Sequence, residues 1–449
     1  MDDNVPSFSF GAEPQIHAGS LADIASFVQP FEFDKYLARF LIIEDGSMLC
    51  IDCHHLIFDG TSISILVDRI LEILEGDAID FFDDGVLRQI SFEENIGSQY
   101  FDEAEEFFDV MMSDIDEVYE LIPSVDGGND NEVYLSTFDI SSDYLNSFLK
   151  AHNTTHNKLF CSVFAYTLSG FSGSQKVFFN LIENGRRHVD LSQSVGMFVR
   201  TLPLIINCEN QSVDSFLNYS SALINSAMKY DLYSYQNLAN RYGIDSSILF
   251  QYAHNLYDNF ANGNGLYESI EELDHNHVGD LSFFIFNHGE NALGIKVEYS
   301  IKYSHDLIMR FVESFKLILK DMLKVDELSE INYTTLSDLK ILDSFNQTDA
   351  NLKYNCVLEA FNDNLAKYSD KNLVLSDDAD YTYGQTACLV NQINSLLKDN
   401  NISSDDRVAI FVDRNQWVIA TALSCLSSAI TYIPIDENYP DKRIAFMIE

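Results

Sequence analysis

The most informative local pattern in this chain is Cys53-His54-His55-Leu56-Ile57-Phe58-Asp59-Gly60. Two adjacent histidines are followed by three apolar residues and then by Asp-Gly. We predict an apolar strand before this stretch and an amphipathic helix after it. An imidazole is thereby placed where a strand changes into a helix, a position at which a base can be held against a reacting group.

The segments on either side of the histidines carry clear local signals. Phe40–Ile43 and Met48–Cys53 are predicted strands, and Glu44-Asp45-Gly46 between them is a hairpin signal. Thr61-Ser62 can cap the following helix. The apolar positions of that helix have helical spacing: Ile63, Ile65, Leu66, Ile70, Leu71, Ile73 and Leu74.

Length, charge and the first residues limit the class of protein. At 449 residues the chain is too long for one ordinary domain, and 46% of it is hydrophobic, so we expect two or three folded domains. The net charge of −43 repels nucleic acid and anionic lipid, so neither is an expected partner. No apolar run reaches the roughly 18 residues of a membrane span. Met1 is followed by two aspartates instead of a secretory signal, which favours a cytoplasmic protein.

The cysteines do not predict a metal site or disulfides. Cys50 and Cys53 form a C-x-x-C pair, but residues three apart on a strand point to opposite faces. No second pair completes a zinc site, so no metal is expected. We interpret all seven cysteines as reduced, as in a cytoplasmic protein.

Helices and strands are mixed along the rest of the chain. The polar segment 125–130 is a predicted boundary between two lobes, and 262–265 is a predicted surface loop. Predicted strands lie at 133–138, 176–182, 281–286 and 293–299, and predicted helices at 102–121, 144–151, 159–168 and 306–323. A polar linker around 342–348 precedes a new unit in which helices and strands alternate, as in the opening of a βαβ-type domain.

Several further stretches accompany the histidine motif in a fixed order. They are Phe27 to Phe33 with its Pro30-Phe31-Glu32, Asn184-Gly185-Arg186, Val195-Gly196-Met197-Phe198-Val199-Arg200-Thr201-Leu202, Asp231 to Leu238, and Phe250-Gln251 to Asn255. Together with H-H-x-x-x-D-G, this series resembles the condensation domains of nonribosomal peptide synthetases. After the linker, Tyr381-Thr382-Tyr383 and Ile430 to Asp436 with Tyr439-Pro440 resemble the first two motifs of an adenylation domain.

The resemblance implies a domain plan. It places an incomplete N-terminal condensation lobe at 1–130, a C-terminal lobe at 131–335, a linker at 336–352 and the beginning of an adenylation domain at 353–449. The implied fold is mixed α/β, with two chloramphenicol-acetyltransferase-like lobes followed by a truncated α/β adenylation subdomain. We therefore expect a piece of a larger synthetase, whose adenylation part is inactive alone.

The reaction that the resemblance implies is amide formation. The amine of an acceptor substrate, held on a carrier domain, attacks the thioester of a donor held on another carrier. The family assigns catalysis to His55, with His54 packed behind it; in an extended segment the two side chains would point to opposite sides. His55 takes the amine proton or only orients the amine; the sequence leaves both open. No nucleophilic serine or cysteine with a base is found, so direct transfer is expected.

Five other residues receive expected roles. Asp59 is expected to shape the loop, with Arg186 as its cationic partner because a buried carboxylate needs one. Arg186 is alternatively a lobe-interface or carrier contact. Gly60 allows either a turn with positive φ or close approach of the phosphopantetheine arm; an ordinary helix start is the alternative. Gly196 and Asn255 are candidates for lining the substrate channel.

Partners and cofactors follow from the resemblance as well. The partners are donor and acceptor carrier domains and the remaining synthetase modules. No cofactor is expected to bind directly; the phosphopantetheine arms belong to the carriers, and ATP and Mg²⁺ belong only to an intact adenylation domain.

Some features depart from the family and keep rival functions open. Only 53 residues precede His54, so the N-terminal lobe is expected to be short, and Arg200 replaces the usual asparagine. An epimerization domain shares the histidine motif, but adenylation-type sequence directly after the linker disfavours it. A heterocyclization domain would carry Asp in place of the histidines, and a free acyltransferase using coenzyme A does not explain the tail. A non-catalytic remnant that only docks carriers is the rival from another class.

Overall fold

The chain divides into two compact units in the computed structural model, residues Met1–Ser344 and Phe345–Glu449, and each is described by itself. The structure describes residues 15–32, 35–43, 46, 48–76, 83–118, 121, 130–245, 247–253, 279–288, 292–376, 379–412 and 414–448. The predicted boundary at 125–130, except Asp130, and the predicted loop at 262–265 lie outside these residues. No helix among those described is long and apolar enough to cross a bilayer.

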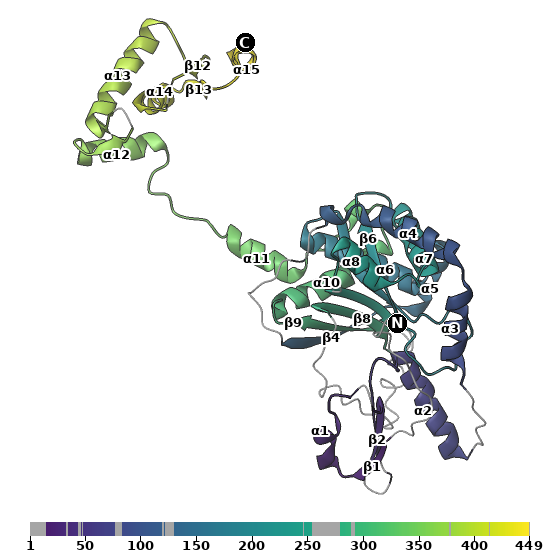
Figure 1. Ribbon diagram of the computed structural model, residues 1–449. Helices are drawn as coiled ribbons and strands as arrows, with labels where there is room; N and C mark the ends of the chain where they lie inside the picture. The colour runs from purple at the N-terminus through teal and green to yellow at the C-terminus, as the bar shows by residue number, and fades with distance from the viewer. Residues whose placement is uncertain are drawn as a thin grey trace. The chain divides into compact units, whose positions relative to one another are not determined.

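The first unit begins with a three-stranded mixed sheet (Figure 1). Strand β1 (Gln15–Gly19) pairs in parallel with β2 (Ala38–Ile43), and β2 pairs antiparallel with β3 (Met48–Cys53). A short 3-10 helix and α1 (Ile24–Phe27) connect β1 to β2. The hairpin predicted from Phe40–Ile43 and Met48–Cys53 is confirmed, because Ile43 pairs with Met48 and Ala38 with Cys53.

Three helices follow this sheet. They are α2 (Gly60–Glu75), α3 (Gly85–Asn95) and α4 (Ser98–Met112). The N-cap of α2 is Asp59 and not the predicted Thr61-Ser62. The Asp59 carboxylate accepts the Ser62 backbone N–H, so the helix already begins at Gly60. The helix predicted at 102–121 is also corrected, since α4 ends at Met112 and only a 3-10 turn at Ile115–Glu117 continues it.

A six-stranded mixed sheet forms the framework of the C-terminal part of this unit. Its order is β4 (Asn131–Asp139), β9 (Ala292–Ser300), β8 (Leu281–Asn287), β7 (Ile248–Ala253), β5 (Lys176–Glu183) and β6 (Arg200–Asn207). The pairs of β7 with β5 and with β8 are parallel, and the other pairs are antiparallel. Two mixed sheets with flanking helices confirm the predicted α/β fold class.

The helices of this part begin where the sequence offers a capping hydroxyl. They are α5 (Ser142–Ala151), α6 (His156–Ser172), α7 (Val213–Lys229), α8 (Tyr235–Tyr242) and α10 (His305–Met322). Their caps are Ser141, Thr155, Ser212, Ser234 and Ser304, and each side chain accepts a backbone N–H from the first turn. The helices predicted at 144–151, 159–168 and 306–323 are thus confirmed, although α6 extends further at both ends.

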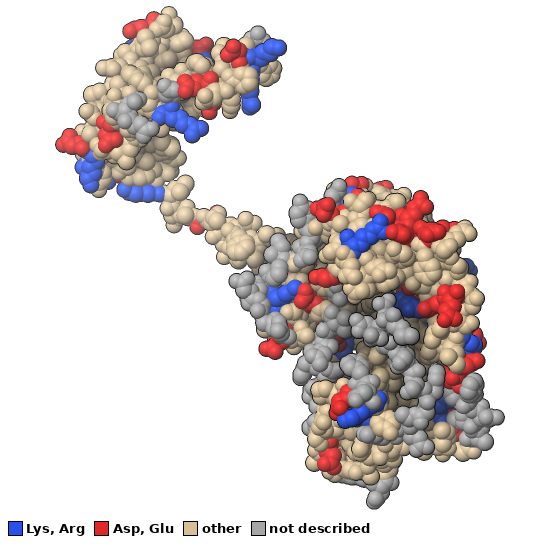
Figure 2. Space-filling model, viewed as in Figure 1, with Lys and Arg blue, Asp and Glu red and all other residues tan. Residues whose placement is uncertain are grey.

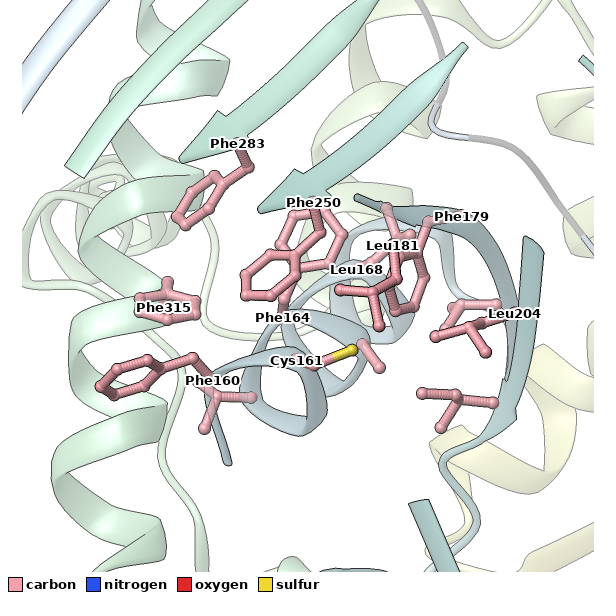
Figure 3. Close-up of a cluster of buried hydrophobic side chains, with 14 of the residues drawn as sticks. Phe160, Cys161, Phe164, Leu168, Phe179, Leu181, Leu204, Phe250, Phe283 and Phe315 are labelled. Atoms are coloured by element: carbon pink, nitrogen blue, oxygen red, sulfur yellow. The ribbon is translucent and has the colours of Figure 1, made fainter. Parts of the chain in front are cut away.

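The core lies between this sheet and helices α6 and α10, and it is rich in phenylalanine. Figure 3 shows Phe164 of α6 beside Phe250 and near Phe179 and Phe283, which come from three different strands. The ring centroid of Phe164 lies 5.1 Å from those of Phe179 and Phe250 and 5.2 Å from that of Phe283. Edge-to-face and tilted contacts at this spacing add to the free energy of burying the rings. This packing makes the six-stranded sheet a rigid base for the loops at its ends.

The second unit is a small α/β arrangement. Its elements are α12 (Val357–Tyr368), β10 (Asn372–Val374), β11 (Tyr381–Thr382), α13 (Tyr383–Asp399), β12 (Arg407–Ile410), α14 (Gln416–Ser427), β13 (Thr431–Pro434) and α15 (Asp441–Ile448). Strands β12 and β13 pair in parallel across α14, which is the predicted βαβ pattern. The segment 336–352, predicted as a linker, is helical over α11 (Leu336–Asn346).

Acidic side chains outnumber basic ones, as the net charge requires. Figure 2 shows them gathered in patches on the larger body, one of them in the region where Figure 1 labels α4. Helix α4 itself carries Asp102, Glu103, Glu105, Glu106 and Asp109.

Candidate functional site

The two histidines lie in a turn directly after β3. The backbone N–H of His54 donates to Leu37 O at 2.8 Å, and the N–H of Ile57 donates to His54 O at 3.1 Å. The chain therefore reverses here, whereas the sequence predicted an extended segment. The two side chains still differ in environment as expected: His54 is half-buried and His55 is exposed.

His54 is fixed from two sides. Its Nδ1 lies 3.0 Å from the backbone N of Leu56, which donates to it, so this nitrogen acts as an acceptor. The edge of the ring meets Phe31 at a centroid distance of 5.7 Å and an interplanar angle of 85°. His54 thus supports the turn, and its place behind a catalytic His55 stays a prediction.

His55 has a defined tautomer in this geometry. Its Nδ1 lies 2.8 Å from Phe58 O, and a carbonyl oxygen can only accept, so the Nδ1 atom carries the proton of the neutral ring. The lone pair of the neutral imidazole is then on Nε2. An exposed imidazole with its lone pair at Nε2 can accept a proton or a hydrogen bond from a substrate amine.

Asp59 connects this turn to a distant loop. One carboxylate oxygen, Oδ1, accepts from Ser62 N at 2.9 Å and from Arg186 Nη2 at 2.8 Å, and the other, Oδ2, accepts from Phe198 N at 3.0 Å. The side chain of Asp59 is 1% exposed and that of Arg186 is 5% exposed. The predicted ion pair is therefore present and buried, with hydrogen bonds to both carboxylate oxygens.

Arg186 is held as tightly as its partner. Its Nη1 donates to Leu191 O at 2.7 Å and to Ser194 O at 2.6 Å, and the guanidinium lies 4.6 Å from the centroid of the Phe198 ring. These contacts fix the loop between β5 and β6 against the start of α2. The alternative role as a carrier contact does not agree with this burial.

Ser62 and Gly196 form the second link between the loop and α2. The hydroxyl of Ser62 lies 2.9 Å from both the N and the O of Gly196. A Cβ atom at Gly196 would lie 2.7 Å from the Phe198 ring, so a larger residue does not fit. Gly196 is thus buried in this contact, and its predicted place along the substrate channel stays a prediction.

The structure tests part of the prediction for Gly60 but not the prediction for Asn255. Close approach of the phosphopantetheine arm to Gly60 stays a prediction, but the predicted turn with positive φ is wrong, since Gly60 starts α2 and does not have a positive φ. The reason is that Asp59 already caps the helix. Asn255 lies outside the described residues.

Three residues of the site were not found from the sequence. Phe58 contributes only its carbonyl oxygen, and Phe198 its backbone N–H and ring, so their side-chain types gave no signal. Ser62 could have been found, because a serine three residues after an Asp helix cap is well placed to contact it. Arg200, the unusual replacement, donates to Glu93 of α3 at 2.5 Å and so ties that helix to β6.

Comparison with known families gives the identity of this fold. The family model of the condensation domain matches residues 19–341. The chain belongs to the condensation domain family. Condensation domains of nonribosomal peptide synthetases are amide-forming acyltransferases, and an AMP-binding enzyme model matches residues 361–449 directly after this one.

Relatives that match along most of the chain are peptide synthases far longer than it. Bacitracin synthase 2 of Bacillus licheniformis is 26% identical over 452 residues, which is 95% of this chain and 17% of the synthase. Gramicidin S synthase 2 of Brevibacillus brevis is 24% identical over 469 residues, 95% of this chain and 10% of that protein. The chain thus spans less than a fifth of these relatives.

Solved structures show the same fold. A four-domain nonribosomal peptide synthetase, solved with AMP and glycine, matches with a TM-score of 0.63 at 17% identity, over 98% of this chain and 37% of the other. The first condensation domain of the CDA synthetase matches with a TM-score of 0.52 at 14% identity, over 72% and 78%. An epimerization domain of tyrocidine synthetase B has a TM-score of 0.54, so the condensation domain fold alone does not distinguish the two reactions.

Proposed function

We propose that this condensation domain forms an amide bond between two carrier-bound substrates. In this proposal, His55 orients the amine of the acceptor substrate and accepts its proton. The observation that carries the proposal is the exposed His55 ring with its Nδ1 2.8 Å from Phe58 O, which leaves the Nε2 lone pair available to a substrate. Asp59, Gly60 and His54 then build the turn, and Arg186 anchors it.

The chemistry needs only this one acceptor. The amine nitrogen attacks the thioester carbonyl carbon of the donor, the new C–N bond forms and the C–S bond breaks. The amine proton passes to Nε2 of His55, which then gives a proton to the departing thiolate and returns to its neutral form. Because aminolysis of a thioester is favourable, a neutral base that also orients the amine supplies much of what catalysis requires.

The rigid support of the turn is the physical basis for orientation. The buried pair of Asp59 and Arg186 joins the start of α2 to the β5–β6 loop, and His55 lies on the same backbone four residues before Asp59. A displacement of about 1 Å at a reacting group can cost about a hundredfold in rate. The position of His55 therefore depends on that pair.

The partners belong to the same proposal. Donor and acceptor carrier domains bring the substrates on phosphopantetheine arms, and the remaining synthetase modules supply and receive them. ATP and Mg²⁺ would serve an intact adenylation domain; among the described residues, no cluster of three or more His, Cys, Asp or Glu could hold a metal ion. All seven cysteines are free thiols, which supports a cytoplasmic location.

The test is single-turnover condensation with loaded carriers. A donor carrier bearing an isotopically labelled aminoacyl thioester is mixed with an acceptor carrier and the full chain, and dipeptidyl carrier is measured by mass spectrometry. We expect product from the wild type and a loss of about a hundredfold or more with His55→Ala. His152→Ala is the matched control, because His152 bonds Asp214 outside the motif, and it should keep the wild-type rate.

Each result of this assay separates the candidate functions. Equal rates for wild type and His55→Ala would remove His55 from the mechanism. Exchange of the donor α-hydrogen for deuterium without amide product would identify an epimerization domain. A folded protein that binds carriers and forms no product with any loaded pair would support a role in docking alone.

A further inference from the structure

A second buried cluster lies on the other side of the β5–β6 loop. Its core is Asp231, which follows α7 and whose side chain is fully buried. His188 Nε2 lies 2.5 Å from Asp231 Oδ1, and Arg187 Nε lies 3.2 Å from Asp231 Oδ2. The loop residues 187 and 188 therefore both bind one carboxylate.

The same loop points its preceding residue in the opposite direction. Arg186 binds Asp59 at the start of α2, whereas Arg187 and His188 bind Asp231 at the end of α7. Three consecutive side chains thus connect two separate buried carboxylates. Because these three residues are consecutive in the backbone, a displacement of Arg187 and His188 at Asp231 would also displace Arg186.

Further contacts hold this cluster in place from neighbouring helices and from β5. The His188 ring stacks on Phe92 of α3 with a centroid distance of 5.1 Å and an angle of 23°. Arg187 Nη2 donates to Glu183 at 2.9 Å, and Asn157 donates to the other oxygen of Glu183 at 2.6 Å. The cluster therefore joins α3, α6, β5 and the end of α7 to the loop.

Gly185 shows that the loop has little freedom to adjust. Its φ is +64°, and a Cβ atom there would lie 1.8 Å from Phe198 O. Phe198 in turn donates its N–H to Asp59. The backbone of Gly185 is thus in close contact with Phe198, which binds Asp59, the N-cap of α2. A rotation of the loop would therefore displace Asp59.

From these contacts we infer that His188 and Asp231 are positioning residues of the condensation reaction: together they hold the β5–β6 loop so that Arg186 meets Asp59 and His55 is aimed at the acceptor amine. This inference rests on the proposed function of His55. Neither residue touches the reacting atoms, and their effect passes through Arg186. The required feature is the N–H that His188 Nε2 donates to the buried carboxylate.

Two substitutions of His188 separate the hydrogen bond from the stacking. His188→Gln places an amide N–H near the position of Nε2 and keeps the bond to Asp231. His188→Phe keeps a ring against Phe92 but has no donor. Tyr299→Phe is the control for loss of a buried hydroxyl. Tyr299 forms hydrogen bonds with Glu132 and His305, and neither partner belongs to the β5–β6 loop.

The experiment measures kcat and the acceptor-carrier KM for the full chain, together with thermal melting. We expect roughly tenfold to a hundredfold lower kcat for His188→Phe with KM within about twofold, because orientation is lost and carrier docking is not. His188→Gln should restore at least about half of the wild-type kcat, and Tyr299→Phe should lower the melting temperature without this fall in kcat. Asp231→Leu, which has no acceptor for the His188 N–H, should behave as His188→Phe does, and it replaces that variant in the comparison if His188→Phe melts below the assay temperature.

The outcomes distinguish this inference from the proposed function. A wild-type kcat for a folded His188→Phe or Asp231→Leu would overturn it, as would a Gln variant as slow as the Phe variant. A fall in kcat that Tyr299→Phe reproduces at equal melting temperature would also overturn it, because general destabilisation would then explain the effect. Loss of activity in His55→Ala alone, with active His188 variants, would leave the proposed function standing.

Discussion

Arg186 and Asp59 are 127 residues apart in the sequence, and their charged atoms lie 2.8 Å apart in a site from which water is almost excluded. The pair fixes the start of α2 to the β5–β6 loop and so decides where the histidine turn ends. A buried pair of this kind contributes little as an attraction, but loss of one member leaves the other charge unbalanced.

Asp59→Ala should therefore be strongly destabilising. It removes the cap of α2 and leaves Arg186 buried without its anion, and we expect a loss of about 3–5 kcal/mol in the free energy of unfolding. Urea unfolding followed by far-UV circular dichroism measures this loss. Trp417, the single tryptophan, lies in the second unit, so its fluorescence does not report directly on the site of this substitution.

The matched control is Asp84→Ala. Asp84 pairs with Arg88 at 2.7 Å, but both side chains are more than 40% exposed. An exposed pair contributes roughly 0.5 kcal/mol or less, so this variant should unfold close to the wild type. Equal stability of Asp59→Ala and Asp84→Ala would show that the buried pair is not needed for the fold.

Gly185→Ala should be damaging for a separate reason. Its φ of +64° already costs an L-residue about 1–2 kcal/mol, and its Cβ would lie 1.8 Å from Phe198 O, so the backbone of the loop must move. We expect a lower melting temperature and a large fall in the condensation rate. Melting and single-turnover assays on the same preparation measure both.

Gly173→Ala tests how much of that effect is due to φ alone. Gly173 ends α6 with a φ of +70°, and a Cβ added to it would have no other atom within 4 Å. This variant should lose about 1–2 kcal/mol and keep its activity. If the two variants lost activity to the same degree, the contact with Phe198 would not be the cause.

The histidine motif shows how far local sequence patterns reach. The hairpin before His54, the helix after Gly60 and the hydroxyl caps of the later helices depend on neighbours within a few residues, and the hairpin and the helices were predicted. Different surroundings for His54 and His55 were also predicted, although from an extended segment, whereas the structure has a turn there.

The contacts of the β5–β6 loop could not be predicted from local sequence patterns. Phe198 N reaches Asp59, and His188 reaches both Phe92 and Asp231, through contacts between segments that are far apart in the chain. Only the packing of the six-stranded sheet against its helices brings these segments together. Asp231 was part of a recognised stretch, but nothing local indicated that it is fully buried or that it binds the loop.

Glu183 predicts a pH dependence of stability. Burial raises the pKa of its carboxyl above the usual 4.5, with the nearby Asp231 charge adding to the effect and Arg187 opposing it. The folded protein then binds more protons than the unfolded chain between pH 4.5 and the raised pKa. The contribution of Glu183 to stability is therefore largest below pH 4.5 and falls as the pH rises through the folded pKa.

Glu183→Gln removes this titration, so the stability of the variant relative to the wild type should rise with pH across that window. Urea unfolding at a series of pH values measures the difference. Asp190→Asn should show the opposite slope, and only below about pH 3.8, because hydrogen bonds from Ser192 lower the pKa of Asp190 from that value. A flat difference for Glu183→Gln would contradict the raised pKa.

The cysteines should divide into reactive and protected groups in the native protein. Cys356 and Cys388 are exposed, whereas Cys161, Cys208 and Cys425 are buried. Burial raises the pKa of Cys53 to about 11 and that of Cys208 further, which lowers the fraction of reactive thiolate. Titration with an aromatic disulfide at mildly alkaline pH should give two fast thiols, and all seven in denaturant. The Cys356→Ser, Cys388→Ser double variant should lose the fast phase. Rapid labelling of Cys53, next to the histidines, would mean that the end of β3 opens in solution and that the turn holding His55 is not fixed.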